Sequence, residues 1–495
     1  MNYLLKNTQR ILFLSLVITF SCGYEDDGDT TSYNFNSLEG DTFAPAGDKY
    51  AELEENPFVD VAEQPVSTFS IDADGASYSN VRRFIQDDHQ LPPKGAIRTE
   101  ELINYFDLDY EYTSSSHPIS LNGEVSECPW NVENKLIRIG IQGQPMNQAR
   151  LASNFVFLID VSGSMGSEDK LELLKNGFKR YVDELTSEDR VAIVTYAGSA
   201  GVTLNATAGN QKEVIKTAID RLGSGGSTAG AQGIITAYEI AQQNFIEGGN
   251  NRIILGTDGD FNVGVSNPDS LVALIKRKRE SGVYLTVLGV GRGNLNDASL
   301  EQIANNGNGT YEYVDNLSQL MKVFVYEQSK FYTVAKDVKV QVKFNPELVS
   351  AYRLIGYENR LLSEEDFEDD SEDAGEIGAD QNITAIYEIV PTTINPLQRN
   401  VPSFTIDFRY KQPDSDTSVP MELEIYDQNI AFLQASSQMQ FVGGIAAFSM
   451  LMTDSKFKGT ATYDQVLDWL ENSSLADEHG FKAELKELVI KARSM

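Results

Sequence analysis

The chain has 495 residues and carries 73 acidic against 40 basic side chains, a formal net charge of −33 at pH 7. This balance excludes a phosphate-binding surface of the kind that nucleic-acid-binding proteins use, because such surfaces are basic. At roughly 150 residues per domain, the length predicts about three domains. Two cysteines and three histidines exclude a thiolate zinc site and a disulfide framework, so any metal site must be built from oxygen atoms.

The first 21 residues predict a signal peptide. Lys6 and Arg10 precede an apolar run of ten residues, Ile11 to Phe20, which is too short for a permanent membrane-spanning helix. The run ends at Ser21 and Cys22, and small residues before a cysteine at this point resemble a bacterial lipobox. That resemblance implies cleavage before Cys22 and lipidation of its thiol and new amino group. Ordinary secretion, with Cys22 incidental, is the alternative.

Residues 22–64 predict an acidic, flexible tether. The stretch from Gly23 to Asn56 combines acidic residues with Ser, Thr, Asn and Gly and has no periodic apolar pattern. An acidic cluster directly after the lipidated cysteine resembles the export signal of surface lipoproteins of the Bacteroidetes type. The alternative is a linker that is acidic only because the whole protein is. We therefore expect a Gram-negative outer-membrane lipoprotein, on the periplasmic face or at the cell surface.

Residues 149–330 show the alternation of a doubly wound, Rossmann-like α/β domain. Four continuous apolar runs predict strands of a parallel sheet covered by helices on both faces: Phe155 to Ile159, Val191 to Tyr196, Ile253 to Leu255 and Val283 to Val290. Between the first two strands, apolar residues recur at helical spacing: Leu171, Leu174, Phe178, Val182 and Leu185. Further helices are predicted at 212–221, 228–245 and 268–281. Ligands of such sheets bind at the carboxyl ends of strands, where the strand order reverses.

Side chains with oxygen atoms stand at these strand ends. They are Asp160, Ser162 and Ser164 at and after the end of the first strand, Thr228 after the glycine-rich loop 223–227, and Asp258 after the strand at Ile253. Mg²⁺ prefers six oxygen ligands in an octahedral array and takes few carboxylates plus waters. Hydroxyls and carboxylates suit that demand, and the glycines let the backbone turn tightly. The sequence therefore predicts a Mg²⁺ site, with Mn²⁺ or Ca²⁺ as alternative ions and a turn without metal as the competing interpretation.

At these residues the sequence resembles the von Willebrand factor type A (VWA) domain. The metal-ion-dependent adhesion site (MIDAS) of that family has the pattern Asp-x-Ser-x-Ser, a distant Thr and a distant Asp, and all five positions match in order. The resemblance implies direct coordination by Ser162, Ser164 and Thr228. It implies that Asp160 and Asp258 act directly or through water. It also implies an open position on the metal that a Glu or Asp of a protein partner fills.

Further segments are similar to bacterial envelope proteins in which a VWA domain lies between two family-specific flanks. These segments are Ser67 to Phe84, Arg98 to Phe106, Thr257 to Val265, Val349 to Arg360, Asp373 to Ala379 and Ser455 to Val466. That family has no well-defined biochemical activity, and its C-terminal flank is described as a domain of unknown function. The resemblance therefore implies the architecture more than the role.

The flanks predict β-structure on both sides of the α/β domain and helices at the C-terminus. Alternating strand patterns occur at 119–125, 135–142, 337–344, 382–389 and 403–410. We expect residues 119–148 and 332–432 to form one β-sandwich that the VWA domain interrupts, with two separate domains as the alternative. Helices are predicted at 438–452, 463–472 and 481–493. The expected order is a family-specific region at 65–148, the VWA domain at 149–330, and a β-rich region at 331–495 that ends in helices.

Three other motifs carry weaker predictions. Ile71 to Gly75 resembles the nucleophile loop of haloacid-dehalogenase phosphatases, but no doubly wound domain follows it in the expected place, so a turn is predicted. Gly289 to Gly293 is similar to a dinucleotide loop and is better explained as a strand-to-helix turn. Glu364 to Glu376 has nine acids in 13 residues without the pattern of an EF-hand, which predicts an exposed acidic loop with weak calcium binding as the alternative. The histidines lie near no serine nucleophile motif, so no catalytic residue is assigned.

The sequence favours a non-enzymatic, envelope-anchored lipoprotein that binds a protein, or a glycan, through a Mg²⁺-dependent MIDAS. The first alternative is a metal-assisted hydrolase or envelope processing factor, against which stands the lack of a base or nucleophile beside the metal loops. The second is a metal-independent assembly scaffold whose contacts come from the sandwich. A nucleic-acid partner is not expected.

Overall fold

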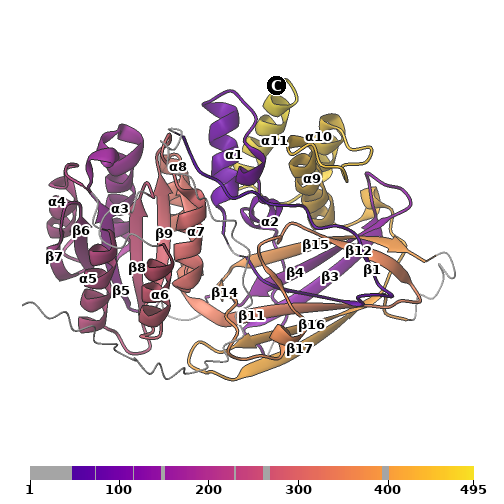
Figure 1. The fold of residues 1–495 in the computed structure, drawn as a ribbon, viewed down its shortest axis with the longest axis horizontal. Coiled ribbons are helices and arrows are strands. Elements are labelled where there is room, and N and C mark those ends of the chain that lie inside the picture. Colours follow the sequence, from indigo (N-terminus) through magenta and orange to yellow (C-terminus); the bar gives the residue numbers. More distant parts are fainter. Residues whose placement is uncertain are drawn as a thin grey trace, which may run out of the picture. The chain divides into compact units, whose positions relative to one another are not determined.

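The computed structural model describes residues 47–72, 74–114, 116–146, 151–227, 230–259, 268–392 and 401–495. The predicted signal peptide with Cys22, most of the predicted tether, and Thr228 of the predicted metal site lie outside these residues. The described chain forms three sheets, of which one has the α/β architecture and two form a sandwich (Figure 1). Within the described residues, no helix combines the length and the apolar character needed to span a membrane.

The α/β domain is built on a six-stranded sheet in the order β10-β9-β8-β5-β6-β7. Its strands are β5 (Ser153–Asp160), β6 (Arg190–Tyr196), β7 (Ala200–Ala208), β8 (Asn250–Thr257), β9 (Tyr284–Val290) and β10 (Tyr311–Val314). The strands are parallel except for the edge strand β7, which pairs antiparallel with β6. The chain passes from β5 to β6 on one side and later returns to β8 on the other. The sheet therefore has its switch point at the carboxyl end of β5.

Helices cover both faces of this sheet, as the continuous apolar strands predicted (Figure 1). On one face lie α3 (Leu173–Glu184), α4 (Lys212–Asp220) and α8 (Leu317–Met321), and on the other α5 (Gly230–Gln243), α6 (Pro268–Arg279) and α7 (Asp297–Asn306). Successive side chains of β5 alternate between the two cores: Phe157 packs toward α3 and Leu158 toward α5. Every residue of the predicted helical stripe from Leu171 to Leu185 is buried on the α3 side. The predicted α/β fold class is confirmed.

The flanks on both sides of the α/β domain share one β-sandwich. One sheet has the order β1-β12-β15-β4-β3, built from β1 (Val59–Asp60), β3 (Ile119–Glu127), β4 (Lys135–Gly143), β12 (Val349–Ile355) and β15 (Asn382–Pro391). The other has the order β13-β2-β11-β16-β17, built from β2 (Val66–Ser70), β11 (Thr333–Phe344), β13 (Leu361–Leu362), β16 (Phe404–Lys411) and β17 (Ser418–Ile425). Each sheet combines strands from before and after the α/β domain. One interrupted sandwich, and not two separate domains, is therefore the arrangement.

A layer of helices covers the outer face of the first sheet (Figure 1). It consists of α1 (Ala76–Gln86), α2 (Thr99–Asn104), α9 (Ser437–Met452), α10 (Tyr463–Asn472) and α11 (Phe481–Ala492). On β4, Leu136 packs into this layer while Ile137 and Ile139 pack between the two sheets. Burial from both sides explains why β4 is covered along nearly its whole length. By contrast, exposed and half-buried residues alternate along most of β17, because one face of the second sheet meets solvent.

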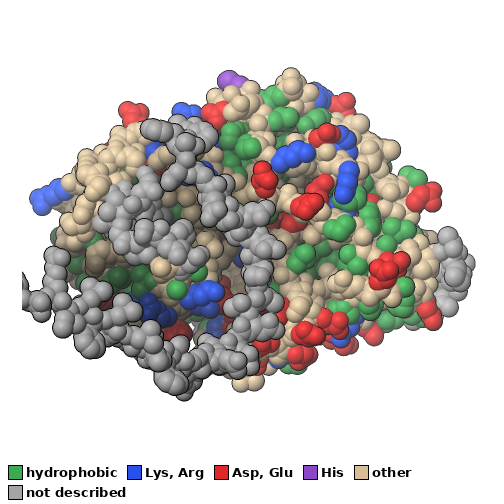
Figure 2. Space-filling view, viewed as in Figure 1, with side chains coloured by type: hydrophobic (Ala, Val, Ile, Leu, Met, Phe, Trp, Pro, Cys, Tyr) green, Lys and Arg blue, Asp and Glu red, His purple; other side chains and the backbone are tan. Residues whose placement is uncertain are grey.

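The acidic run from Glu364 to Glu376 is an exposed loop only in part. Its end enters a short strand, β14 (Gly375–Gly378), which pairs antiparallel with β11. Arg409 of β16 forms ion pairs with Glu368 and Asp370, and the latter contact is 3.1 Å. These ion pairs hold the acidic run against the second sheet of the sandwich. The sequence analysis did not predict this contact. On the face of the molecule that Figure 2 shows, acidic side chains are scattered over the sandwich among basic and apolar side chains.

Candidate metal centre

The predicted ligands of β5 and β8 meet at the switch point of the α/β sheet. Asp160 is the last residue of β5, and Asp258 directly follows β8. The two strands are hydrogen-bonded neighbours in parallel register, so their carboxyl ends lie at the same edge. Ser162 and Ser164 stand in the turn after β5, with their hydroxyl oxygens 3.0 Å apart. The structure thus brings together four of the five residues that the sequence predicted.

The glycine-rich loop before Thr228 is hydrogen-bonded to the turn after β5. The amide of Gly225 donates to the carbonyl of Val161 at 2.7 Å, and the amide of Gly163 donates to the carbonyl of Gly226 at 3.0 Å. Gly226 has a φ of 88°, a left-handed conformation that favours glycine at this close approach. This contact brings the loop that leads to Thr228 against the two serines, although Thr228 itself is not among the described residues.

Asp160 is fully buried and held by two donors. One carboxylate oxygen accepts a hydrogen bond from the backbone amide of Ser162 at 2.8 Å, and the other accepts one from the hydroxyl of Thr257 at 3.1 Å. Burial raises the pKa of Asp160 to about 6, against the opposing effect of hydrogen bonds from Ser162. The carboxyl group is therefore mostly ionised at neutral pH. Thr257 was not predicted as a member of the site, although it ends β8 directly before Asp258 and begins the Thr257 to Val265 segment.

Asp258 is also fully buried, and its partners include a cation. Its Oδ2 accepts the ammonium of Lys170 at 3.1 Å and the amide of Asn294 at 3.0 Å. Burial acts to raise the pKa of Asp258, but hydrogen bonds from Asn294 and Ser164 and the charge of Lys170 together hold it below its usual value. Asp258 is therefore ionised at neutral pH. Lys170 and Asn294 were not predicted as members of the site.

Lys170 and Asn294 lie beside elements that the sequence predicted. Lys170 lies in the helical turn Glu168–Glu172 just before α3. Asn294 lies in the connection from β9 to α7, directly after the Gly289 to Gly293 segment, which forms the strand-to-helix turn that the sequence predicted. The weak signal for Asn294 was its position after the carboxyl end of a parallel strand, where ligand-contacting loops gather.

These residues fit a bound Mg²⁺ ion. Two ligands at neighbouring corners of an octahedron with metal distances of about 2.1 Å are separated by about 3.0 Å. The hydroxyl oxygens of Ser162 and Ser164 have that separation, which also allows a hydrogen bond between them without an ion. All donor atoms offered by the four residues are hard oxygens, the type that Mg²⁺ prefers. For Ca²⁺, with longer bonds, the same corners would be further apart.

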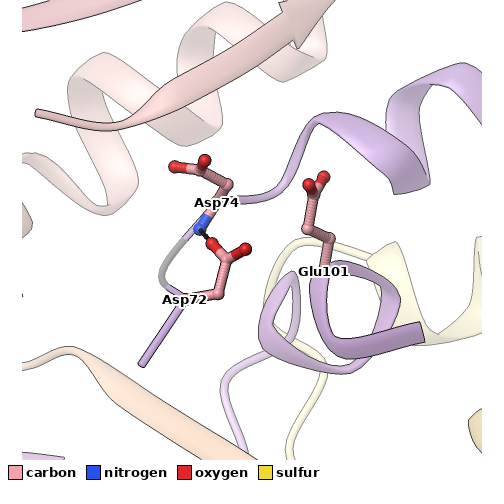
Figure 3. A group of neighbouring side chains, drawn as sticks. All are labelled: Asp72, Asp74 and Glu101. Carbon is pink, nitrogen blue, oxygen red and sulfur yellow. Dashed lines mark hydrogen bonds between the residues drawn. The ribbon is translucent and has the colours of Figure 1, made fainter. Parts of the chain in front are cut away.

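A second group of buried carboxylates lies near the start of α1. Asp72, Asp74 and Glu101 bring oxygen atoms within 4.8 Å of one another, and in Figure 3 the Asp74 and Glu101 carboxylates do not point toward each other. Arg360 donates to Asp72 at 3.0 Å, and Arg98 contacts both oxygens of Glu101. Guanidinium groups therefore supply positive charge to this cluster, and we assign it a structural role. The segment joins β2 to α1, in agreement with the predicted turn.

Three protein families match the chain. Residues 44–138 match the family described as von Willebrand factor, residues 154–325 match the von Willebrand factor type A domain, and residues 329–495 match the C-terminal part of the uncharacterized protein YfbK. A VWA domain points to a role in protein interaction or adhesion, and such domains often bind a divalent metal. The VWA match spans nearly the whole six-stranded sheet and includes both aspartates of the candidate site.

Several proteins and solved structures are similar to this chain over part of its length. Among solved structures, a von Willebrand factor type A protein from Catenulispora acidiphila is 16% identical, with a TM-score of 0.43 over 77% of this chain and 98% of that chain. The conserved hypothetical protein BatB from Bacteroides thetaiotaomicron is 27% identical, with a TM-score of 0.31 over 36% of this chain and 98% of that chain. A UPF0353 protein of Mycobacterium sp. (strain KMS) is 28% identical over 236 residues, 41% of this chain and 69% of that protein.

One relative matches almost end to end. The uncharacterized protein YfbK of Escherichia coli (strain K12) is 38% identical over 472 residues, which cover 90% of this chain and 81% of YfbK. The match therefore includes the α/β domain and both flanks, so it concerns the whole architecture and not the VWA domain alone. The chain belongs to the family of the uncharacterized protein YfbK, with a von Willebrand factor type A domain between its flanking regions.

Proposed function

We propose that this protein binds an acidic group of a protein partner through a Mg²⁺ ion held by Asp160, Ser162, Ser164, Thr228 and Asp258. The observation that supports this most directly is the meeting of two hydroxyls and two buried carboxylates at the switch point of the sheet. When bound, the ion supplies an electrophilic centre that accepts an oxygen ligand. The residues of the chain hold and orient that centre. A glycan that offers oxygen ligands is the second ligand class.

The charge of the site favours an acidic ligand once the metal is present. Asp160 and Asp258 contribute two negative charges when ionised, and Lys170 contributes one positive charge at a contact of 3.1 Å. A divalent ion added to this set gives a net charge of about +1, which attracts a carboxylate at short range. We propose no enzymatic activity. Among the described side chains at the site, the carboxylates and the lysine are engaged in hydrogen bonds, which supports a binding role.

We further propose that the protein is anchored in the envelope by a lipid on Cys22. This rests on the apolar run that ends at Ser21 and Cys22, followed by an acidic stretch. Mass spectrometry of the N-terminal peptide from membrane fractions should show a diacylated or triacylated Cys22. The variant Cys22→Ser should lose the modification and leave the membrane fraction. An unmodified mature N-terminus at another residue would contradict the anchor.

Metal binding is tested first, on the soluble chain from Gly23. Isothermal titration with MgCl₂ should show one site in the unaltered protein and none in the double variant Ser162→Ala, Ser164→Ala. The matched control is Thr195→Ala, Thr203→Ala, which removes another pair of hydroxyls, 2.9 Å apart on β6 and β7. The control should bind Mg²⁺ like the unaltered protein. Equal binding by all three proteins would refute the site.

Partner binding is tested by pull-down from solubilised envelope with the same three baits. The proposal expects one partner that the unaltered and control baits capture in Mg²⁺, and that EDTA or the double serine variant releases. Substituting the partner's surface Asp and Glu residues should then identify the one carboxylate on which capture depends. A partner held equally with EDTA would instead assign binding to the flanks and support a metal-independent scaffold.

A further inference from the structure

Lys170 ties together three of the loops that build the metal centre. Its ammonium donates to Asp258 at 3.1 Å, to the backbone carbonyl of Ser164 at 3.0 Å and to the side-chain oxygen of Asn294 at 2.6 Å. These acceptors follow β8, β5 and β9, respectively. Lys170 is only 5% exposed. A buried ammonium has three hydrogens to satisfy, and here three protein oxygens accept them.

The backbone is shaped around the Lys170 side chain. Gly291 has a φ of 78°, and a Cβ atom at this position would lie 2.2 Å from Cε of Lys170. Only glycine therefore leaves room for the lysine stem between the β9 connection and the turn before α3. Gly291, Asn294 and the backbone carbonyl of Ser164 thus together place one positive charge beside Asp258.

We propose that Lys170 is a built-in counter-charge, which weakens metal binding at the site and leaves the metal-loaded site positive enough to bind an acidic ligand. This rests on the proposed function. With Lys170, the charges of Asp160 and Asp258 sum to −1 and the loaded site carries +1. Without Lys170, the sums are −2 and zero. Removing the charge therefore has two effects of opposite sign: tighter metal binding and weaker binding of a carboxylate.

This pair of effects separates the proposal from a purely structural role. A lysine that only holds the loops in place would, when replaced, loosen the ligand set and weaken metal binding. Lys170→Met keeps the length of the stem beside Gly291 and removes the charge. Lys170→Gln also removes the charge but can still donate hydrogen bonds to Asp258. If both neutral variants bind metal more tightly, the cause is charge and not packing.

The experiment measures Mn²⁺ binding, from the electron paramagnetic resonance signal of free Mn²⁺, by the soluble chain from Gly23. Lys170→Met and Lys170→Gln should each bind Mn²⁺ about tenfold more tightly than the unaltered protein, as expected for one charge screened by solvent. Lys175→Met is the matched control, because Lys175 is also buried but donates to Glu172 and the Leu222 carbonyl. It should bind Mn²⁺ like the unaltered protein. Circular dichroism establishes that each variant is folded.

The outcomes distinguish this proposal from the proposed function. Unchanged or weaker Mn²⁺ binding by both Lys170 variants, with normal binding by the unaltered protein, would overturn the counter-charge and leave the metal site intact. Absence of Mn²⁺ binding by the unaltered protein would overturn both. In a second measurement, sodium acetate serves as the carboxylate probe. It should increase the Mn²⁺ affinity of the unaltered protein more than that of Lys170→Met, because binding of the two ligands is thermodynamically linked.

Discussion

Replacing Arg98 with methionine should lower the free energy of unfolding by about 3 kcal/mol near neutral pH, the lower end of the range for breaking a buried ion pair. The Arg98 side chain is 1% exposed and joins α2 to α7. Its guanidinium contacts both carboxylate oxygens of Glu101, and it lies 2.7 Å from Asp297 and 3.7 Å from Glu301. The variant removes the positive charge that these buried carboxylates share.

The lower end applies because the carboxylates keep other donors. Glu101 still accepts the amide of Ser77 at 2.7 Å, and Asp297 still accepts the hydroxyl of Tyr311 at 2.8 Å. The expected loss of stability therefore comes from buried negative charge that no cation balances. It does not include the cost of leaving the carboxylates without any hydrogen-bond donor. Losses at the three carboxylates should not be added, since they share one partner.

The same reasoning fixes the pH dependence of the loss. Burial raises the pKa of Glu101, and Arg98 opposes that shift. Without Arg98 the pKa in the folded state rises further, so the folded variant holds a proton that the unfolded chain releases. Stability then falls as pH rises, and the deficit of the variant shrinks as pH is lowered and Glu101 becomes protonated in the folded state of both proteins.

Urea unfolding measures the loss and is followed by the fluorescence of Trp130 and Trp469, which are both buried in the core between the helical layer and the first sheet. Arg409→Met is the control, because Arg409 pairs with the more exposed Glu368 and Asp370. This variant should lower the free energy of unfolding by at most about 1 kcal/mol. A deficit for Arg98→Met no larger than that of the control would refute the reasoning. So would a deficit that does not change with pH.

Three further changes have defined outcomes. Burial raises the pKa of Glu100 from 4.5 to about 8, so stability should fall as pH rises across that interval, and urea unfolding of Glu100→Gln should show a weaker dependence. Asp48 accepts the amides of Gly293 at 2.7 Å and Leu295 at 3.1 Å, so Asp48→Ala should speed hydrogen exchange at both amides, measured by mass spectrometry. Ile137 is fully buried between the two sheets, so Ile137→Ala should lower the free energy of unfolding, measured in urea, by about 2–5 kcal/mol.

The α/β domain was predictable because its strands are buried on both faces. Apolar side chains at nearly every position, as in Phe155 to Ile159 and Val191 to Val194, are required only where helices cover both sides of a sheet. The placement of Asp160 and Asp258 followed from the same rule, since parallel strands end at one edge. The sequence could therefore locate the candidate ligands without any knowledge of side-chain contacts.

The surroundings of those ligands were not predictable in the same way. Lys170 lies on a helical turn among acidic residues, and a lysine in such a segment is usually solvated. Its burial depends on Gly291 and Asn294, which are more than a hundred positions away. Hydrophobic periodicity reports which face of an element is covered. It does not report which distant polar groups meet there.

Helix α1 shows the same limit in the flanks. Almost all of its residues are buried, including the polar Asn80, Arg82 and Arg83. A sequence search for an apolar stripe misses such a helix, because its arginines are buried by pairing and not exposed. Arg82 pairs with Asp315 at 2.5 Å, and Arg83 pairs with Asp48 at 2.7 Å. Both partners were identifiable only once the fold had brought them together.

The overall charge of −33 and the proposed acidic ligand act at different distances. At physiological ionic strength, charges more than about 8 Å apart are largely screened, so most acidic residues contribute little to the field at a ligand already in contact. At contact in the proposed metal-loaded site, the positive charges of the ion and Lys170 exceed the negative charges of Asp160 and Asp258. The net charge therefore slows the approach of an acidic partner but does not determine the affinity of the contact. The partner that fits both conditions presents one carboxylate on a surface that is otherwise neutral or basic.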